Sequence, residues 1–254
     1  MLRLELPHIK QEFDWDCGLA CVQMVLRRIR GNRLSKTEFE DVCKDLGFGN
    51  SVWTIDLASI FAYYGMKCGF FTETLGVDIA YKSNSFYCET FQMDSNRVNR
   101  LFRKAKKLGI DVEKRVVSLE EILEKLSSGY VAIALTNSYM LHCDWCTPLD
   151  TYSMIMASYC SKCTGLDNYN GHFVIVCGYD LDSKCFYYKN PSKDENLCRM
   201  KFHAFESAWH CFGTDSDIVF IDVNQERSRK DSSSFKPVIS SSIQDYKVEQ
   251  MVLG

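Results

Sequence analysis

The amino-acid sequence predicts an α+β fold, in which a helical N-terminal half packs on an antiparallel sheet formed by the C-terminal half. Before residue 130, apolar residues recur mainly at the spacing of helices. After residue 130, short runs rich in β-branched and aromatic residues end at Gly or Asp. This separation of helices from strands is typical of the α+β class. A chain of 254 residues with 46% apolar residues can bury a sizeable core.

One short strand and five helices are predicted in the first half. Leu2, Leu4 and Leu6 alternate with charged residues and indicate the strand. The helices show amphipathic or apolar patterns, and several begin at a Ser or end at a Gly. They span residues 19–30, 35–46, 54–64, 96–107 and 118–126. The fourth helix carries a basic run that begins at Arg97. We interpret this run as a solvated helix face rather than as a site for phosphate or an acidic partner.

In the second half, four strands are predicted. They span residues 131–135, 173–176, 185–189 and 218–223. We expect a single domain over residues 1–223, with a Cys-rich insert at about residues 140–165. Residues 224–254 are polar and rich in Ser, so this tail is predicted to be disordered.

Four residues indicate a thiol site. Gln11 and Cys17 lie in the segment Q-E-F-D-W-D-C-G, which leads directly into the first predicted helix. His172 begins a strand in G-H-F-V-I-V-C-G-Y-D, and Asn190 follows another in Y-K-N-P. Gln, Cys, His and Asn are the residue types of a papain-like thiol hydrolase, in the order that such an enzyme uses them. Taken alone, a Cys at a helix start is more often a core residue.

Each of these residues has an expected role. The N–H groups at a helix start favour a thiolate, so Cys17 is the candidate nucleophile. His172 is the candidate base, and the side-chain carbonyl of Asn190 is expected to fix its tautomer. The Gln11 amide and the Cys17 backbone N–H are expected to stabilise an oxyanion. Gly18 is expected to leave room for a substrate backbone.

Two families are similar to this sequence. The pattern Q-x5-C-G-L-A-C-x-x-M-V-L followed by G-H-F-V-I-V-x-G-Y-D resembles the C39 (bacteriocin-leader) peptidases, which have a papain-like cysteine peptidase fold. A fuller match over roughly residues 5–223 resembles the guanylyl cyclase domain-containing protein family. It includes S-V-W-T-I-D-L-A at 51–58, F-G-T-D at 212–215 and N-P at 190–191.

The two resemblances imply different reactions. The C39 resemblance implies a nucleophile at Cys17, a base at His172, an oxyanion glutamine at Gln11 and an orienting residue at Asn190, where C39 peptidases commonly have Asp. The name of the second family implies conversion of GTP to cyclic GMP. The sequence offers no Gly-rich phosphate loop and no paired acidic strand motif for that reaction. A catalytically inactive peptide-binding or adaptor module, and related acyl chemistry such as deamidation or transfer, remain alternatives to a peptidase-like hydrolase.

A metal site is predicted in the Cys-rich insert. Two C-x2-C pairs lie thirteen residues apart and supply Cys143, Cys146, Cys160 and Cys163. This spacing is close to that of zinc ribbons, and a closed four-thiolate site would hold a structural Zn²⁺ with no position for a catalytic water. His142 could replace one ligand, and unmetallated or redox-active thiols are the alternative.

The composition indicates which kinds of partner and which cellular compartment to expect. A net charge of −3 indicates no nucleic-acid partner. No apolar stretch approaches the roughly 18 residues of a membrane span, and no signal peptide is evident. The chain has thirteen cysteines, an odd number that argues for reduced thiols in the cytoplasm or nucleus. We expect a peptide or protein substrate and no organic cofactor, and the oligomeric state is left open.

Overall fold

A single mixed sheet organises the molecule. The structure is a computed structural model that describes residues 1–31, 34–47, 49–78, 91–146 and 169–224. In these ranges eight strands form one sheet in the order β3-β2-β8-β4-β5-β6-β7, with β1 paired to β5. The strands are β1 (Leu2–Arg3), β2 (Cys68–Thr72), β3 (Asp111–Lys114), β4 (Tyr130–Asn137), β5 (Gly171–Asp180), β6 (Cys185–Lys189), β7 (Cys198–Lys201) and β8 (Ile218–Asp222). All neighbours are antiparallel except β2 and β3, which are parallel.

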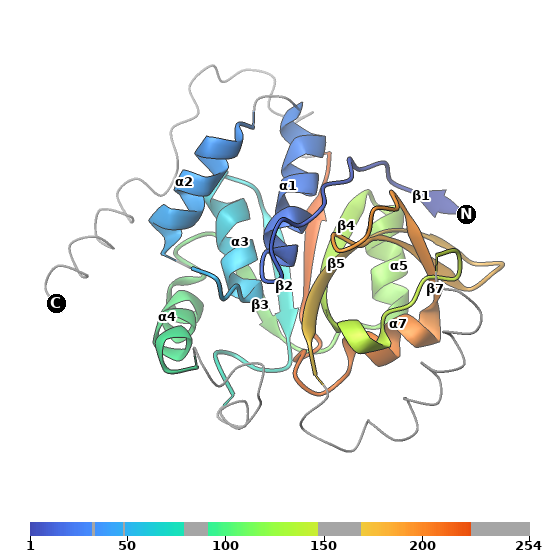
Figure 1. Cartoon of the computed structure of the whole chain (residues 1–254). Coiled ribbons are helices and arrows are strands. Elements are labelled where there is room, and N and C mark those ends of the chain that lie inside the picture. Colours follow the sequence, from blue (N-terminus) through green and yellow to red (C-terminus); the bar gives the residue numbers. More distant parts are fainter. Residues whose placement is uncertain (32–33, 48, 79–90, 147–168, 225–254) are drawn as a thin grey trace, which may run out of the picture.

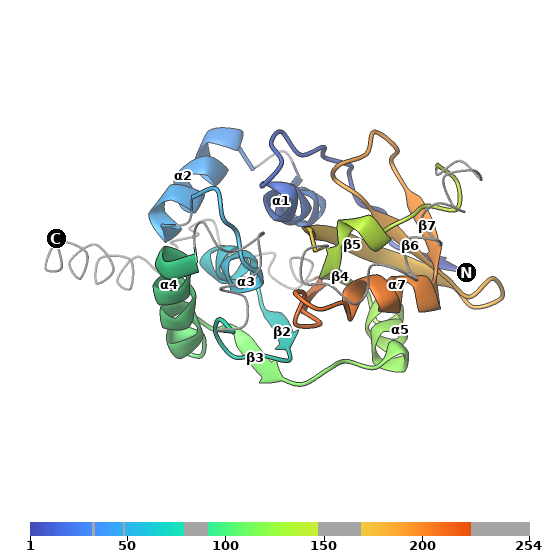
Figure 2. The same cartoon turned by 60° about the horizontal axis from the view of Figure 1, so that its bottom comes forward.

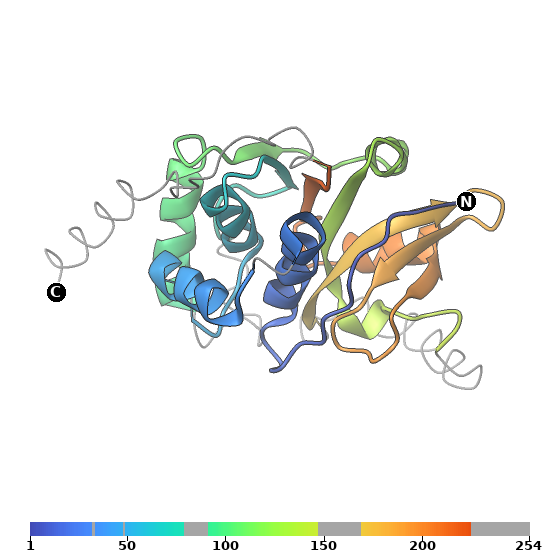
Figure 3. The same ribbon diagram turned by 90° about the horizontal axis from the view of Figure 1, so that it is seen from above.

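Helices cover both faces of this sheet (Figures 1 and 2). The described helices are α1 (Cys17–Arg30), α2 (Lys36–Leu46), α3 (Thr54–Tyr63), α4 (Phe91–Lys104), α5 (Leu119–Ser127), η3 (Ser138–Met140, a 3₁₀ helix) and α7 (Phe202–Trp209). Helices α1 to α4 lie on one side, whereas α5 and α7 lie on the other. Figure 3 shows α1, in dark blue, against the central strands.

The alternation of side chains along β4 explains why both faces need a cover. Val131, Ile133 and Leu135 join the hydrophobic cluster formed with α1 to α4. Ala132 and Ala134 join the second cluster, formed with α5 and α7. A strand that is buried on both faces reads as a continuous apolar run, which is the pattern of V-A-I-A-L.

The predicted α+β class, with a helical N-terminal half packed on a mainly antiparallel sheet, is confirmed. Several details differ from the prediction, among them β7 and α7, which the pattern of the second half did not indicate. The first half also contributes β2 and β3, short strands that complete the sheet on one side, and α5 and α7 form a second helical layer. Most of the predicted Cys-rich insert (147–168) and the predicted tail from residue 225 lie outside the described residues. Within the described ranges, every helix is too short or too polar to reach across a lipid bilayer.

The interpretation of the basic run was wrong for its first residue. Arg97 is only 9% exposed, and its guanidinium pairs with the carboxylates of Asp56 in α3 and Asp94 in α4. It also donates to the carbonyl of Ser51, 3.2 Å away. Arg97 therefore ties α4 to α3 and to the segment before α3, because two buried acids need a buried cation.

Candidate functional site

Cys17 begins helix α1 and lies against the start of strand β5. Its side chain is buried, and the backbone N–H of Phe173 points at its Sγ at 3.5 Å. Gly18 permits this close approach, because a Cβ on Gly18 would lie 2.9 Å from the Phe173 ring and 3.0 Å from Leu57. The expectation that Gly18 leaves room for a substrate is therefore replaced by a packing role.

His172 and Asn190 form a direct hydrogen bond. The Nε2 atom of His172 lies 2.8 Å from Oδ1 of Asn190. The same Oδ1 accepts from the Ser192 backbone N–H at 3.0 Å and lies 2.8 Å from the Ser192 hydroxyl. A backbone N–H can only donate, so it identifies this atom of Asn190 as the oxygen. His172 must then carry its proton on Nε2, which leaves the lone pair of the neutral ring on Nδ1.

Gln11 is tied to the loop that carries Asn190. Its backbone N–H donates to the carbonyl of Pro191 at 2.9 Å. Its side-chain Nε2 donates to the carbonyl of Phe13 at 2.7 Å, and its Oε1 is buried and accepts no hydrogen bond from the described residues. The segment between Gln11 and α1 is held by Asp16, whose carboxylate accepts from two backbone N–H groups. In the described conformation the Gln11 amide thus binds its own loop.

Burial controls the charges of the thiol and the imidazole. It raises the pKa of Cys17 to about 11, against the hydrogen bond from the Phe173 N–H. Burial also lowers the pKa of His172, while the hydrogen bond to Asn190 opposes this shift. The expected resting thiolate at the helix start is therefore not favoured, because desolvation outweighs the helix N–H groups. Both shifts favour the neutral forms of the thiol and of the imidazole at neutral pH.

A cleft of about 310 Å³ opens beside Cys17. Trp15 and Trp53, the two tryptophans nearest to the thiol in sequence, contribute to its wall. Asp215 and Asp217 line it as well and were not identified from the sequence. Asp215 ends the F-G-T-D segment of the family resemblance, which assigned it no role, whereas the signal for Asp217 was its position immediately before an apolar strand.

The backbone that carries these two acids is strained and held in place. Asp215 and Ser216 both have positive φ angles, 49° and 48°, a region that non-Gly residues rarely adopt. The Ser216 hydroxyl bonds the Glu73 carboxylate and lies 2.8 Å from Nδ1 of His210. The backbone N–H of Glu73 in turn donates to the Asp215 carbonyl at 2.9 Å. A strained backbone that several hydrogen bonds hold in place is common at functional sites.

Comparisons with known proteins identify the family. A family profile described as "Guanylylate cyclase" matches residues 6–221. The chain belongs to this family. Guanylyl cyclase 1 of Arabidopsis thaliana is 34% identical over 227 residues, which are 89% of this chain and 78% of that protein. A crystal structure described as a C39-like peptidase from Bacillus anthracis is 21% identical, with a TM-score of 0.29, over 49% of this chain and 56% of that one.

This guanylylate cyclase family member also contains a cluster of thiols. Cys143, Cys146 and Cys198 have Sγ atoms that all lie within 4.8 Å of one another and could hold a metal ion. Hydrogen bonding from Cys198 is the largest of the causes that lower the pKa of Cys143. Two of the four predicted ligands are thus in the cluster, and the other two, Cys160 and Cys163, lie outside the described residues.

Asp217 gives a test of the charge in the cleft. Burial, reinforced by the Asp215 carboxylate, raises its pKa well above the ordinary value. Between the unfolded and the folded pKa only the unfolded state loses the proton, so stability falls by about 1.4 kcal/mol per pH unit as pH rises. We expect Asp217→Asn to remove this slope, in urea unfolding measured from pH 5 to pH 8. The exposed Asp111→Asn should keep it, and parallel curves for wild type and Asp217→Asn would contradict a buried neutral acid.

Proposed function

We propose that the protein is a papain-like thiol hydrolase that acts on a peptide or protein, with a cysteine peptidase as the simplest form. One observation carries the proposal. The start of β5 supplies the Phe173 N–H that points at the Cys17 thiol, and its neighbour His172 is oriented by Asn190. A thiol, a base and a residue that fixes the tautomer of the base are the parts that nucleophilic acyl transfer requires.

The charges support a mechanism that begins from neutral groups. Nδ1 of His172 takes the proton of the Cys17 thiol, and the resulting thiolate attacks the acyl carbon of the substrate. The backbone N–H of Cys17 then donates to the oxyanion, and the Gln11 amide joins it after leaving the Phe13 carbonyl. His172 gives its proton to the leaving group, and water releases the acyl group from Cys17. No resting thiolate is needed, which agrees with the raised pKa of Cys17.

Guanylyl cyclase activity is the second candidate, because the family and its Arabidopsis thaliana member carry that name. Cyclisation of GTP uses metal ions held by carboxylates. Among the described residues, the one group of three or more possible ligands within 4.8 Å of one another consists of thiols. Two carboxylates, Asp215 and Asp217, do line the cleft. Acyl chemistry is favoured because the Phe173 N–H contacts Cys17 and Asn190 orients His172. An inactive module that binds a peptide in the same cleft is the third candidate.

The experiment that separates these candidates uses the reactivity of Cys17. Iodoacetamide at pH 7, followed by peptide mass spectrometry, should label Cys17 before the other thiols outside the cluster of Cys143, Cys146 and Cys198, because His172 takes the proton of Cys17 during the attack. His172→Ala should lower the labelling rate of Cys17 by about 100-fold or more, since a positioned base contributes roughly 10²–10⁴-fold. Cys21→Ala, which removes the buried thiol one turn later, is the matched control and should leave that rate unchanged.

Two outcomes would remove the hydrolase proposal. One is uniform slow labelling of all the thiols. The other is production of cyclic GMP from GTP that survives Cys17→Ala. Selective labelling of Cys17 without cleavage of any peptide in a substrate library would favour the binding module.

We further propose that the thiol cluster binds Zn²⁺ in a structural role and that the protein works in the cytoplasm. Thiolate ligands suit Zn²⁺, and a zinc ion held by sulfur ligands typically has a structural role when a fourth protein ligand closes its coordination shell. The described cysteines are all free thiols, which is consistent with a reducing compartment.

A further inference from the structure

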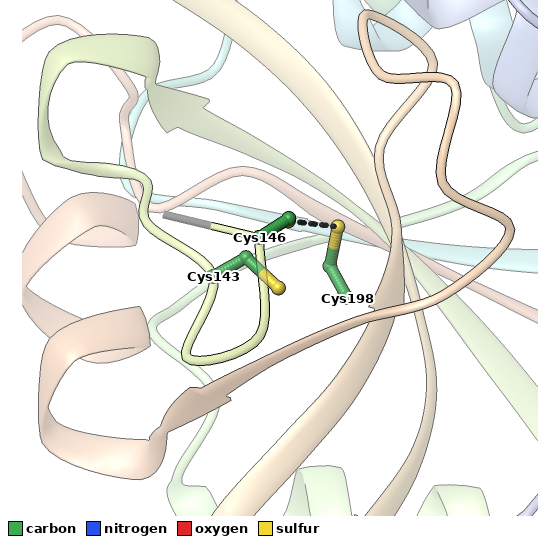
Figure 4. Close-up of side chains that lie close together, drawn as sticks. All are labelled: Cys143, Cys146 and Cys198. Carbon is green, nitrogen blue, oxygen red and sulfur yellow. Dashed lines mark hydrogen bonds between the residues drawn. The ribbon is translucent and has the colours of Figure 1, made fainter. Parts of the chain in front are cut away.

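The thiol cluster joins two segments that are far apart in the sequence. Cys143 and Cys146 lie on the turn that follows η3, and Cys198 is the first residue of strand β7. Figure 4 shows the three side chains gathered between this turn and the strand. Cys198 belongs to no C-x2-C pair, so the spacing of cysteines in the sequence did not indicate it.

The spacing of the sulfurs fits a metal better than a disulfide. The Sγ atoms of Cys146 and Cys198 are 3.8 Å apart. Four sulfurs at about 2.3 Å around a tetrahedral Zn²⁺ lie about 3.8 Å from each other. Two bonded sulfurs would be about 2.05 Å apart. The pair therefore has the spacing of one edge of a metal tetrahedron.

Backbone donors point at the third sulfur. The N–H groups of Trp145 and Arg199 both lie 3.4 Å from Sγ of Cys143. One donor comes from the turn and the other from β7, the two segments that supply the ligands. N–H groups aimed at a sulfur stabilise its negative charge and orient it, which is the outer-shell support that metal ligands need. A thiol that only fills space in a core needs no such pair.

Other contacts hold the turn against β7 and β6 and preposition the site. The Asp144 N–H donates to the Arg199 carbonyl at 2.8 Å, and the Arg199 side chain returns to the Asp144 carboxylate at 3.2 Å. The Tyr188 hydroxyl donates to the carbonyl of His142 at 2.6 Å. Several independent contacts thus hold the turn in place, so that its two thiols face the thiol of β7.

We propose that Cys143, Cys146 and Cys198 together bind one Zn²⁺, with Cys198 as a ligand that the two C-x2-C pairs do not include. Within the described ranges no fourth His, Cys, Asp or Glu atom joins this group. The fourth position therefore belongs to a ligand other than these three residues. The metal joins the turn after η3 to the hairpin β6–β7, whose connecting loop carries Asn190. A role of the metal in positioning Asn190 for catalysis rests on the proposed hydrolase. The metal site itself does not.

The test measures zinc in the full chain. Native mass spectrometry of protein expressed with Zn²⁺ should show roughly one ion per chain for wild type. Cys198→Ser should lose most of it, because a hydroxyl is a poor ligand for this metal. Cys177→Ser is the matched control, since Cys177 is equally buried in a strand but lies outside the cluster. Full zinc occupancy in Cys198→Ser would overturn the proposal.

A second measurement needs no variant and holds even if Cys198→Ser fails to fold. Wild-type protein is treated with N-ethylmaleimide with and without a zinc chelator, and the labelled cysteines are mapped. We expect Cys143, Cys146 and Cys198 to become reactive together when the chelator is added. Release of Cys160 and Cys163 with Cys143 and Cys146, but not of Cys198, would support the original four-ligand prediction instead. A metal-free chain with a Cys146–Cys198 disulfide would also overturn the site. None of these readouts depends on hydrolase activity.

Discussion

In the Asn190→Ala variant, the rate at which Cys17 reacts with an electrophile is expected to fall by about 100-fold or more, because a base that is no longer positioned loses its catalytic contribution. Without Asn190 the Nε2–H of His172 loses its acceptor at 2.8 Å. The ring can then rotate, or carry its proton on Nδ1, the nitrogen that must accept the thiol proton. The second-order rate constant for iodoacetamide labelling of Cys17 at pH 7 measures the effect.

Two variants of the same loop separate orientation from general damage. Asn190→Asp should recover much of the rate, because a carboxylate accepts the same hydrogen bond. Ser192→Ala should cost only a few-fold, since the Ser192 backbone N–H still holds Oδ1 at 3.0 Å. A wild-type rate in Asn190→Ala would show that the His172–Asn190 bond plays no part in activating the thiol.

The pH dependence of the same reaction follows from the state of His172. A protonated imidazole cannot accept the thiol proton, so the rate should fall as pH drops through the pKa of His172. Burial lowers that pKa, so the fall should come at a lower pH than for an ordinary His. A midpoint above the usual His range would contradict a buried neutral base.

Arg97→Ala is expected to lower the free energy of unfolding by about 3–5 kcal/mol, the usual cost of removing one partner from a buried ion pair. The guanidinium compensates two acids, Asp56 and Asp94, whose carboxylates are almost completely buried. Its loss leaves both without their cation, away from water. Urea unfolding monitored by circular dichroism measures the change.

Arg103 on the same helix provides the control for charge alone. Its side chain is exposed, and Arg103→Ala should change stability by less than about 0.5 kcal/mol. Adding Asp56→Asn to Arg97→Ala should restore part of the lost stability, because it removes one uncompensated charge. A loss below about 1 kcal/mol in Arg97→Ala would mean that water or other groups replace the guanidinium.

Local signals in the sequence were sufficient for most helices. Ser35 and Ser118 were expected near helix starts, and both accept the backbone N–H three residues later. The short strands β2, β3 and β7 lacked such signals, because their pairing depends on partners far along the chain. The burial of Arg97 could not be predicted for the same reason, because its partner Asp56 lies 41 residues away in the sequence.

The candidate site shows the same division. The order of Gln, Cys, His and Asn was enough to propose Cys17 and His172 as candidates. The pKa of the thiol depends on how deeply α1 packs on β5, which residue order does not encode. The rule for C-x2-C pairs identified Cys143 and Cys146 but not Cys198, because a single Cys in a strand resembles any buried residue.

The position of β8 in the sheet has a consequence for synthesis of the protein. This last described strand pairs with β2 on one side and β4 on the other, so it alone links β3-β2 to the remaining strands. On the ribosome, the nascent chain therefore cannot close its sheet until residues 218–222 have emerged. A chain that stopped before them would expose two open strand edges, which promote aggregation. Stop codons that end the chain before residue 218 should accordingly yield insoluble product.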